Sequence, residues 1–392
     1  MKYAAVTEQL AGLGSDKWAL SIAASARIAA GQPVINLTIG EPDVGTPQDL
    51  IDTACAAMQA GRTGYSNGRG EASLLDALSA RYTRRLNRPF GRDRFLCLPG
   101  TQTSLYVALN AMCDAGSEVI LGDPLYATYE GLVRSSGAVP VHVPLHPEHG
   151  FRLQAADVAE AITEQTRVIF LNTPHNPTGA ILRPEELAAI GALAREHDLW
   201  ILSDEVYGDL THDGRPFTSA LTDPAFEERT VVTASISKSH AAPGFRSGWL
   251  AGPADFTRRA LPLSETMLFG SQPFIADMTA RAVSGPPVLA QQMAARMARR
   301  AGIIHAALDG VAGLRVLRPE AGMFALLDIR ALSADSQAFA LALLEATDVA
   351  VMPGASFGTA FEGWLRLALN ASDADTAEAC SRIAAHASRL AV

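Results

Sequence analysis

The chain has 392 residues, of which 48% are hydrophobic and 19% are charged, so it is long enough to form two domains with sizeable buried cores. Its formal net charge of −9 disfavours nucleic-acid binding, which requires a basic surface. No apolar run reaches the roughly 18 residues of a membrane-spanning helix, so we expect no membrane association.

Two further features of the composition bear on location and metal binding. The four cysteines form no CxxC pair and show no metal-ligand spacing with histidine, which is typical of a reduced, cytoplasmic protein. The N-terminal sequence MKYAAVTEQLAGL lacks the apolar core and the cleavage site of a signal peptide. His142, His146 and His149 are close together, but the prolines between them favour a turn, and we expect no metal site.

The predicted elements begin with a helix over Val6–Ala30 and a short extended run, VINLTIG, that ends at Gly40. From about residue 50, helical segments alternate with seven short apolar runs, at 94–98, 117–122, 139–145, 167–172, 199–203, 229–237 and 247–252. Apolar runs of this length, bounded by turn residues and separated by helices, predict a mostly parallel sheet that is buried on both faces.

A different pattern follows residue 285. It consists of a long helix over Val288–Asp309, four strand-like stretches (GLRVLRP, GMFALLDI, VAVMPG and WLRLALN) and a final helix over 371–390. The sequence therefore predicts an α/β fold with two domains: a large domain over 49–285, and a smaller α+β domain made of 1–48 and 286–392. Such an architecture hosts many functions, so the function has to be inferred from particular residues.

Ligands of open α/β sheets gather at the carboxyl ends of the strands, so the residues that follow each predicted strand are candidates for a site. Gly100, Thr101 and Gln102 follow the first strand and open an apolar helix. The free N–H groups of such a helix suit a phosphate, although an ordinary strand–helix turn has the same composition. Tyr126 follows the second strand, where it can stack on a flat ligand or pack as a half-buried ring.

Further along the chain, the candidates become more polar. Asn176 lies between Pro174 and Pro177, in a loop that is stiffer than a plain turn requires. Asp204 follows a buried strand, where a carboxylate is costly unless it meets a partner charge, although a helix N-cap is an equal alternative. Tyr207 comes three residues later, so a helical turn would place it on the same side as Asp204.

Lys238 follows the apolar run at 229–237, with Ser235 and Ser237 beside it and Arg246 eight residues later. Taken alone, Lys238 is equally well explained as an ordinary solvated surface lysine. An ammonium group near phosphate-binding serines and an aromatic ring can, however, be tuned to attack a carbonyl carbon. Arg246 offers a bidentate contact to an anion.

These candidates complement one another, because together they supply what pyridoxal phosphate requires. The aldehyde of this cofactor needs a lysine for a Schiff base, and its pyridine nitrogen needs a carboxylate partner to stay protonated. Its 3′-oxygen needs hydrogen-bond donors, and its phosphate needs a helix N-terminus. We therefore expect pyridoxal phosphate as the cofactor.

Seven motifs carry a resemblance to a known family. They are INLTIGEPDVGTP (35–47), GYSNGRG (64–70), DPLYATY (123–129), HNPTG (175–179), SDEVYGDL (203–210), SISKSHAAPGFRSGW (235–249) and WLRLAL (364–369). From about Gly31 to Asn370, the chain resembles the class I aminotransferases of the aspartate aminotransferase family, which are fold-type I enzymes that depend on pyridoxal phosphate. A chance match of all seven motifs in order is very improbable.

The resemblance implies a role for each candidate, with Lys238, Asp204 and Tyr207 as the catalytic residues. Lys238 would be the Schiff-base lysine and proton carrier, and Asp204 would pair with the pyridine nitrogen. Asn176 and Tyr207 would bond the 3′-oxygen, and Tyr126 would stack on the ring. The phosphate would be held by Gly100, Thr101, Gln102, Ser235, Ser237 and Arg246.

The resemblance also implies contacts with the substrate and with a second subunit. Arg366 would clamp the α-carboxylate of the substrate together with Asn176, although a plain strand-face arginine is the alternative. Gly40 would border the substrate. Tyr65 would reach the phosphate of the neighbouring subunit, which implies a homodimer with active sites at the subunit interface.

The implied activity is a ping-pong transamination between an L-amino acid and a 2-oxo acid. Related aspartate enzymes often carry a lysine at the position of Gln102, which disfavours aspartate as the donor. Long stretches, among them LRPEAGMFALLDIR (317–330), resemble arginine–pyruvate transaminases, so we expect arginine as the donor and pyruvate as the acceptor.

Other functions stay open at this point. A transaminase for aspartate or aromatic amino acids would share the same motifs, and so would a pyridoxal phosphate-dependent C–S lyase. The fold also serves as the effector-sensing domain of transcription regulators. We disfavour that function because the chain is acidic and starts almost directly into the fold, with no DNA-binding module before it.

Overall fold

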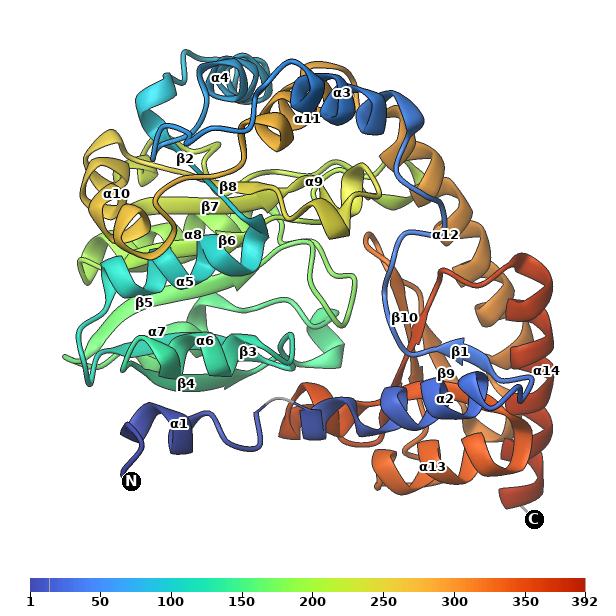
Figure 1. Ribbon diagram of the computed structural model, residues 1–392. Helices are drawn as coiled ribbons and strands as arrows, with labels where there is room; N and C mark the ends of the chain where they lie inside the picture. Colours follow the sequence, from blue (N-terminus) through green and yellow to red (C-terminus); the bar gives the residue numbers. More distant parts are fainter. Residues whose placement is uncertain (14, 392) are drawn as a thin grey trace.

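The computed structural model describes residues 1–13 and 15–391, and it contains two β-sheets flanked by helices (Figure 1). The larger sheet consists of β2 (Phe95–Leu98), β3 (Glu118–Asp123), β4 (Val139–Pro144), β5 (Thr166–Asn172), β6 (Trp200–Asp204), β7 (Thr230–Ser235) and β8 (Gly248–Ala251). Its strand order is β2-β8-β7-β6-β5-β3-β4, and the pairs are parallel except for the two that involve β8. The predicted mostly parallel seven-stranded sheet is confirmed.

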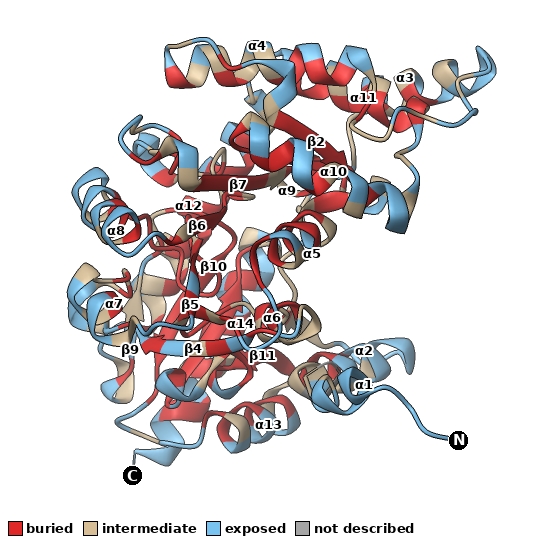
Figure 2. Ribbon diagram, turned by 90° about the vertical axis from the view of Figure 1, so that its left-hand side faces the viewer, coloured by how far each residue is buried: buried red, intermediate tan, exposed pale blue. Residues whose placement is uncertain are grey.

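Helices cover both faces of the larger sheet. The core on one face contains α5 (Gly100–Met112), α6 (Tyr129–Ser135) and α10 (Ala254–Leu268). The core on the other face contains α3 (Gln48–Gln59), α4 (Ala72–Leu86), α7 (Ala155–Ala161), α8 (Pro184–Glu196) and α11 (Pro273–Ser284). Most strands between two such layers are buried along most of their length, as Figure 2 shows for β2 and β7, and this explains why their sequences are mostly apolar. The edge strand β4 differs, because exposed residues alternate with buried ones along it.

The smaller sheet joins the two ends of the chain. It consists of β1 (Ile35–Leu37), β9 (Arg315–Leu317), β10 (Phe324–Asp328), β11 (Val349–Pro353) and β12 (Trp364–Ala368), in the order β1-β11-β12-β10-β9. Its core is closed by α2 (Ala19–Ala29), α12 (Val288–Leu308), α13 (Ser336–Thr347) and α14 (Asp373–Leu390). The helices predicted at 288–309 and 371–390 are thus confirmed, whereas the division into domains at 49 and 285 stays a prediction. Of the helices in the described residues, none combines the length and the apolar composition needed to cross a membrane.

The helix predicted over Val6–Ala30 is wrong, because this segment is divided. α1 (Ala5–Gln9) is followed by a turn and by a short 3-10 helix that ends at Trp18, where α2 begins. Gly12 has a φ of 77°, a left-handed conformation that interrupts a right-handed helix. The break brings the ring of Trp18 to that of Tyr126, with the centroids 6.4 Å apart.

The apolar run predicted as a strand over 229–237 ends two residues early, at Ser235. The Oγ of Ser235 accepts a hydrogen bond from the N–H of Ser237 at 3.3 Å, and the chain enters the single helical turn α9 (Ile236–Ser239). A serine N-cap of this kind fixes where a helix starts. Lys238 therefore projects from a helical turn at the carboxyl edge of the sheet.

Candidate active site

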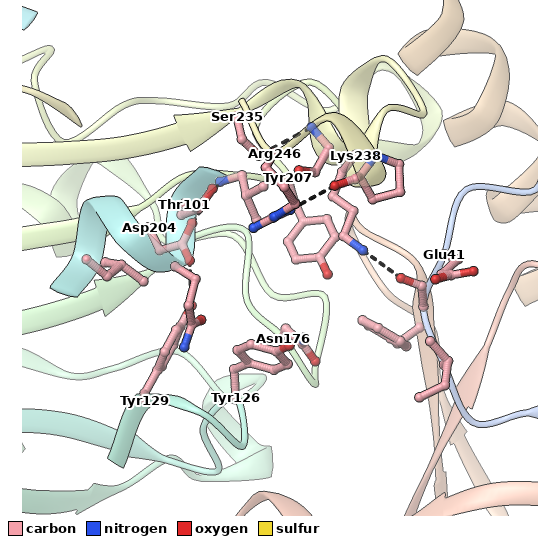
Figure 3. A pocket seen from close by; sticks show the side chains of 18 of the residues that line it. Glu41, Thr101, Tyr126, Tyr129, Asn176, Asp204, Tyr207, Ser235, Lys238 and Arg246 are labelled. Carbon is pink, nitrogen blue, oxygen red and sulfur yellow. Dashed lines mark hydrogen bonds between the residues drawn. The ribbon is translucent and has the colours of Figure 1, made fainter. Parts of the chain in front are cut away.

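A cavity of about 300 Å³ opens at the carboxyl edge of the larger sheet, and Phe324 of β10 and Arg366 of β12 line it from the smaller sheet. The predicted residues that line it are Gly40, Thr101, Gln102, Tyr126, Asn176, Asp204, Tyr207, Ser235, Ser237, Lys238, Arg246 and Arg366. Gly100 lies directly behind Arg246, whereas Tyr65 lies outside the cavity. Figure 3 shows how the lysine, the carboxylate and the aromatic rings converge from different elements.

Lys238 reaches the cavity from α9, and its Nζ donates a hydrogen bond to the carbonyl oxygen of Gly40 at 2.7 Å (Figure 3). The pKa of Lys238 is lowered to about 8, mainly by burial. The positive charges of Arg366 and Arg246 add to this lowering of the pKa, whereas the negative charge of Glu41 opposes it. An amine with this pKa is partly uncharged near neutral pH, as a nucleophile or a proton acceptor must be.

Asp204, at the end of β6, is a buried carboxyl group whose hydrogen-bond donors are both neutral. The hydroxyl of Tyr129 donates to Oδ2 at 2.8 Å, and the N–H of Val206 donates to Oδ1 at 3.1 Å, so Asp204 also caps the following turn. Burial raises the pKa of Asp204 to about 6, although the two hydrogen bonds lower it. A cation placed beside this carboxyl group would be strongly stabilised, because solvent screens the pair only weakly.

The N-terminus of α5 and Arg246 form a basic corner of the cavity. Gly100 has a φ of 82°, and a Cβ atom added to it would lie 2.5 Å from Nη2 of Arg246, so only glycine fits. Arg246 has a φ of 49°, which is a strained conformation for a residue with a side chain. The buried Oγ1 of Thr101 has no hydrogen-bond partner among the described residues. Free N–H groups, an unpaired hydroxyl and a guanidinium together suit a phosphate group.

Arg366, in the middle of β12, is a buried cation that is 1% exposed. Its Nη1 donates to Oδ1 of Asn176 at 3.0 Å, and its Nη2 donates to the carbonyl oxygen of Thr38 at 2.5 Å. The guanidinium also contacts the rings of Phe324 and Phe357, with centroid distances of 3.9 and 4.3 Å. These partners are all neutral, and Nε has no hydrogen-bond partner in the described part of the chain. Such a guanidinium is suited to bind an incoming carboxylate.

Three polar side chains complete the walls of the cavity. Burial raises the pKa of Tyr126 and of Tyr207, so both hydroxyl groups stay protonated at neutral pH and can donate hydrogen bonds. Gln102 is oriented by Thr128, whose hydroxyl donates to its Oε1 at 3.1 Å. The amide nitrogen of Gln102 is the hydrogen-bond donor that remains for a ligand.

Several residues that line the cavity were missed in the sequence, among them Trp18, Glu41, Tyr129 and Phe324. A signal for Tyr129 exists, because it follows Tyr126 by three residues and a helical turn brings such residues to one side. Trp18 has no such signal, whereas Glu41 lies in the family motif at 35–47 and directly follows Gly40, which the resemblance places at the substrate. They follow no strand of the larger sheet, and only the tertiary structure brings the N-terminal segment to the cavity.

Tyr65 takes no part in the cavity of its own chain. Its side chain is 90% exposed and packs against Phe269, which is 63% exposed, with the ring centroids 4.8 Å apart. Two exposed aromatic rings in contact are typical of a surface that binds another molecule. The predicted role of Tyr65 toward a neighbouring subunit stays a prediction.

Residues 32–383 match the family model for aminotransferase class I and II. The chain belongs to this family, whose members use pyridoxal phosphate, and it is an aminotransferase. It is 38% identical to the arginine–pyruvate transaminase of Pseudomonas aeruginosa over 390 residues, which cover 100% of this chain and 99% of that protein. It is 32% identical to the aspartate aminotransferase of Bacillus subtilis over 337 residues, 84% of this chain and 86% of that protein.

Solved structures match the fold over nearly the whole chain. The aspartate aminotransferase of Thermus thermophilus with maleate has a TM-score of 0.91 and 29% identity, and the match covers 98% of this chain and 99% of that chain. The aspartate aminotransferase of Rhizobium meliloti has a TM-score of 0.92 and 27% identity, with 100% of both chains covered. The predicted fold-type I architecture is thus confirmed.

Proposed function

We propose that the chain is a pyridoxal phosphate-dependent aminotransferase that takes its amino group from arginine and transfers it to pyruvate in a ping-pong sequence. The observation that carries this proposal is the meeting of Lys238, Asp204 and Arg366 in one cavity. The choice of substrates is supported by the 38% identity, over the whole chain, to the arginine–pyruvate transaminase.

The residues of the cavity fit each polar group of pyridoxal phosphate. Asp204 would hold the pyridine nitrogen, Asn176 and Tyr207 would donate to the 3′-oxygen, and Tyr126 would stack on the ring. The phosphate would lie among Gly100, Thr101, Gln102, Ser235, Ser237 and Arg246, where the unpaired hydroxyl of Thr101 supports the fit. When bound, this cofactor supplies an aldehyde carbon and a ring that withdraws electrons from the reacting carbon.

Arg366 and Lys238 have different roles toward the substrate: Arg366 binds it and Lys238 transfers its proton. Arg366 and Asn176 bind the α-carboxylate of the donor, which places its Cα near Nζ of Lys238. Nζ, whose pKa is about 8, removes the proton from Cα and holds it for transfer. The carbonyl oxygen of Gly40 accepts a hydrogen bond from Nζ and so orients it on the substrate side of the cavity.

We further propose that the enzyme is a cytoplasmic homodimer. The exposed Tyr65–Phe269 pair supports a subunit interface, at which Tyr65 would reach the phosphate site of a second subunit. The four cysteines are free thiols, which supports a reducing compartment.

A screen of the first half-reaction tests the donor. The near-visible absorbance of the loaded enzyme is followed after addition of arginine, aspartate, an aromatic amino acid or an S-substituted cysteine. We expect arginine to change the spectrum fastest and pyruvate to reverse the change. Much faster conversion by aspartate would reject arginine as the donor, and release of pyruvate and ammonia from the cysteine derivative without any 2-oxo acid would favour a lyase.

A Lys238→Ala variant tests the chemistry itself. Removal of the proton carrier is expected to slow the half-reaction by at least about 10²- to 10⁴-fold, which stopped-flow absorbance measures. The chain has only two other lysines, Lys2 and Lys17, so Lys2→Ala is a direct control that should keep the wild-type rate. Wild-type turnover by Lys238→Ala would contradict the assignment.

A further inference from the structure

The helical turn that carries Lys238 ends at an alanine in a strained conformation. The chain leaves α9 through Ala241, which has a φ of 50°. The left-handed residue at the end of a helix is usually glycine, because a Cβ atom is unfavourable there. Ala241 is 3% exposed and packs in the core of the smaller sheet, which explains why a side chain is present. A strained residue of this kind persists only where its surroundings hold it.

One contact that holds Ala241 comes from a distant part of the sequence. Oγ1 of Thr46 donates a hydrogen bond to the carbonyl oxygen of Ala241 at 2.5 Å. The N–H of Ala241 lies 3.5 Å from the carbonyl oxygen of Lys238, which is longer than an ordinary hydrogen bond. Within the described part of the chain, the hydroxyl of Thr46 is the only side-chain donor to this carbonyl oxygen. Thr46 therefore supports the end of α9.

The segment that carries Thr46 also contacts the side chain of Lys238. It joins β1 to α3 (Figure 1), and the carbonyl oxygen of Gly40 accepts a hydrogen bond from Nζ of Lys238 at 2.7 Å. Further along the same segment, Thr46 binds the backbone at the end of α9. The segment thus contacts the lysine turn at two points, one at the ammonium group and one at the backbone.

Between these two points, the segment is anchored to α12 by ion pairs. The side chain of Asp43 is 4% exposed and accepts hydrogen bonds from Nε and Nη2 of Arg296 at 2.7 and 2.8 Å. It also accepts from Nη1 of Arg300 at 2.9 Å, and Arg300 donates in turn to the carbonyl oxygen of Leu369 at 2.8 Å. Bidentate pairs that are shielded from solvent have a defined geometry. The segment is therefore a fixed support for the lysine turn.

We propose that Thr46 is a positioning residue for Lys238: its hydroxyl holds the end of α9, and this keeps Nζ at its place beside the carbonyl oxygen of Gly40. Thr46 itself does not line the cavity. The inference rests on the proposed function, since it takes Lys238 to be the proton carrier. It is independent of the choice of donor, because every donor amino acid transfers its proton to the same group.

The variant Thr46→Val tests the inference, because it removes the hydroxyl and nearly keeps the shape of the side chain. The loaded enzyme is measured with the fastest donor of the half-reaction screen. We expect the limiting rate to fall on the order of tenfold, because proton transfer depends on the position of Nζ. The donor concentration at half saturation should change by less than about twofold, because Arg366 and Asn176 keep their contacts with the α-carboxylate.

Two further variants control this experiment. Thr46→Ser keeps the hydroxyl and should restore most of the limiting rate. Thr53→Val makes the same substitution in α3, where the hydroxyl of Thr53 donates to the carbonyl oxygen of Asp49 in its own helix at 2.6 Å. Thr53→Val should change neither the limiting rate nor the half saturation.

A second measurement needs no turnover. The chain has three lysines, so competitive acetylation of the full-length protein without cofactor compares Lys238 with Lys2 and Lys17 in one sample, and mass spectrometry reads the result. Burial lowers the pKa of Lys238 to about 8. If Nζ loses its place in Thr46→Val and becomes more solvated, this pKa should rise by at least about half a unit. Thr46→Ser and Thr53→Val should leave it unchanged.

The outcomes separate this inference from the proposed function. If Thr46→Val melts at a lower temperature but keeps the limiting rate and the pKa of Lys238, Thr46 serves stability alone and the inference is wrong. A higher half saturation with an unchanged limiting rate would also contradict it. If Lys238→Ala keeps the wild-type rate, the proposed function fails, and the acetylation experiment alone then decides whether Thr46 positions Nζ.

Discussion

Asp204 and Glu205 are neighbours in the chain, and burial raises the pKa of both carboxyl groups, to about 6 and about 7. Their surroundings differ. Glu205 points into the core, where the hydroxyl of Ser219 donates to it at 3.0 Å and the N–H of Ala220 donates at 2.8 Å. Asp204 faces the cavity and has one side-chain donor, the hydroxyl of Tyr129. A buried acid that faces a cavity destabilises the fold when it is ionised, and a cationic ligand removes this cost.

We therefore predict that Asp204→Asn stabilises the cofactor-free protein and inactivates the enzyme. Because the pKa of Asp204 in the folded state exceeds its usual value of 3.8, the folded state binds more protons than the unfolded state between about pH 4 and 6, and stability falls as pH rises through this window. Asparagine avoids this loss, which is about 3 kcal/mol for a shift of two units.

Thermal melts of the cofactor-free protein at pH 4 and pH 8 provide the measurement. Asp204→Asn should melt above the wild type at pH 8 and close to it at pH 4, whereas Asp52→Asn, at an exposed position of α3, should differ little from the wild type at either pH. A variant that is no more stable than the wild type at pH 8 would show that Asp204 carries no ionisation cost.

The start of α5 shows how one turn of an element serves both the fold and the site. Gly100 has to be glycine for two reasons, its φ of 82° and the guanidinium of Arg246 beside it. Gly116 has a similar φ of 87°, and an added Cβ atom there would meet no atom within 4 Å. An alanine at Gly116 therefore adds backbone strain alone, whereas an alanine at Gly100 adds backbone strain and also displaces the guanidinium of Arg246.

We predict that Gly100→Ala weakens pyridoxal phosphate binding by at least about tenfold, because it adds strain and displaces the guanidinium that holds the phosphate. Gly116→Ala should cost about 1 kcal/mol of stability and leave cofactor affinity unchanged. Fluorescence titration of the cofactor-free variants measures the affinity. Equal weakening in both variants would mean that strain alone, and not Arg246, accounts for the effect.

Elements with a local signal could be predicted from the sequence, and elements without one could not. Most strands of the larger sheet are largely apolar because both of their faces are covered, and the turn at Pro147–His149 follows its prolines. The break at Gly12 depends on a left-handed residue that the helical pattern around it conceals. β1 pairs with β11 from the other end of the chain, and no local pattern in the sequence predicts such a contact.

The same distinction applies to the candidate site. Lys238, Asp204 and Asn176 were predicted because each follows a strand of one parallel sheet, and the carboxyl ends of such strands meet at one edge. Glu41 and Trp18 come from a segment that reaches the cavity only because the smaller sheet holds it there. Residues contributed by tertiary contacts of this kind leave no spacing in the sequence.

At the scale of the whole molecule, the exposed Tyr65 offers a test of whether the active site is shared between two subunits. If Tyr65 serves the cavity of a second subunit, a mixed dimer of Lys238→Ala and Tyr65→Ala contains one intact site, with Lys238 from one chain and Tyr65 from the other. Denaturing and refolding the two weak variants together should then restore about a quarter of the wild-type sites.

The control for this experiment is the refolding of each variant alone, which should leave the transaminase activity as low as before refolding. If the mixture is no more active than its parts, Tyr65 acts in its own chain or has no role in the site, and the shared active site is excluded. Analytical ultracentrifugation at the same protein concentrations measures whether each variant and the mixture form dimers.

Three consecutive backbone carbonyls, those of Thr38, Ile39 and Gly40, accept hydrogen bonds from side chains that belong to other elements. Two of these donors, Arg366 and Lys238, are the groups that the substrate also needs. An arriving carboxylate competes with Thr38 for the guanidinium, and proton transfer by Nζ competes with its bond to Gly40. The measured affinity for a donor amino acid is therefore the strength of its own contacts minus the cost of the backbone contacts that it displaces.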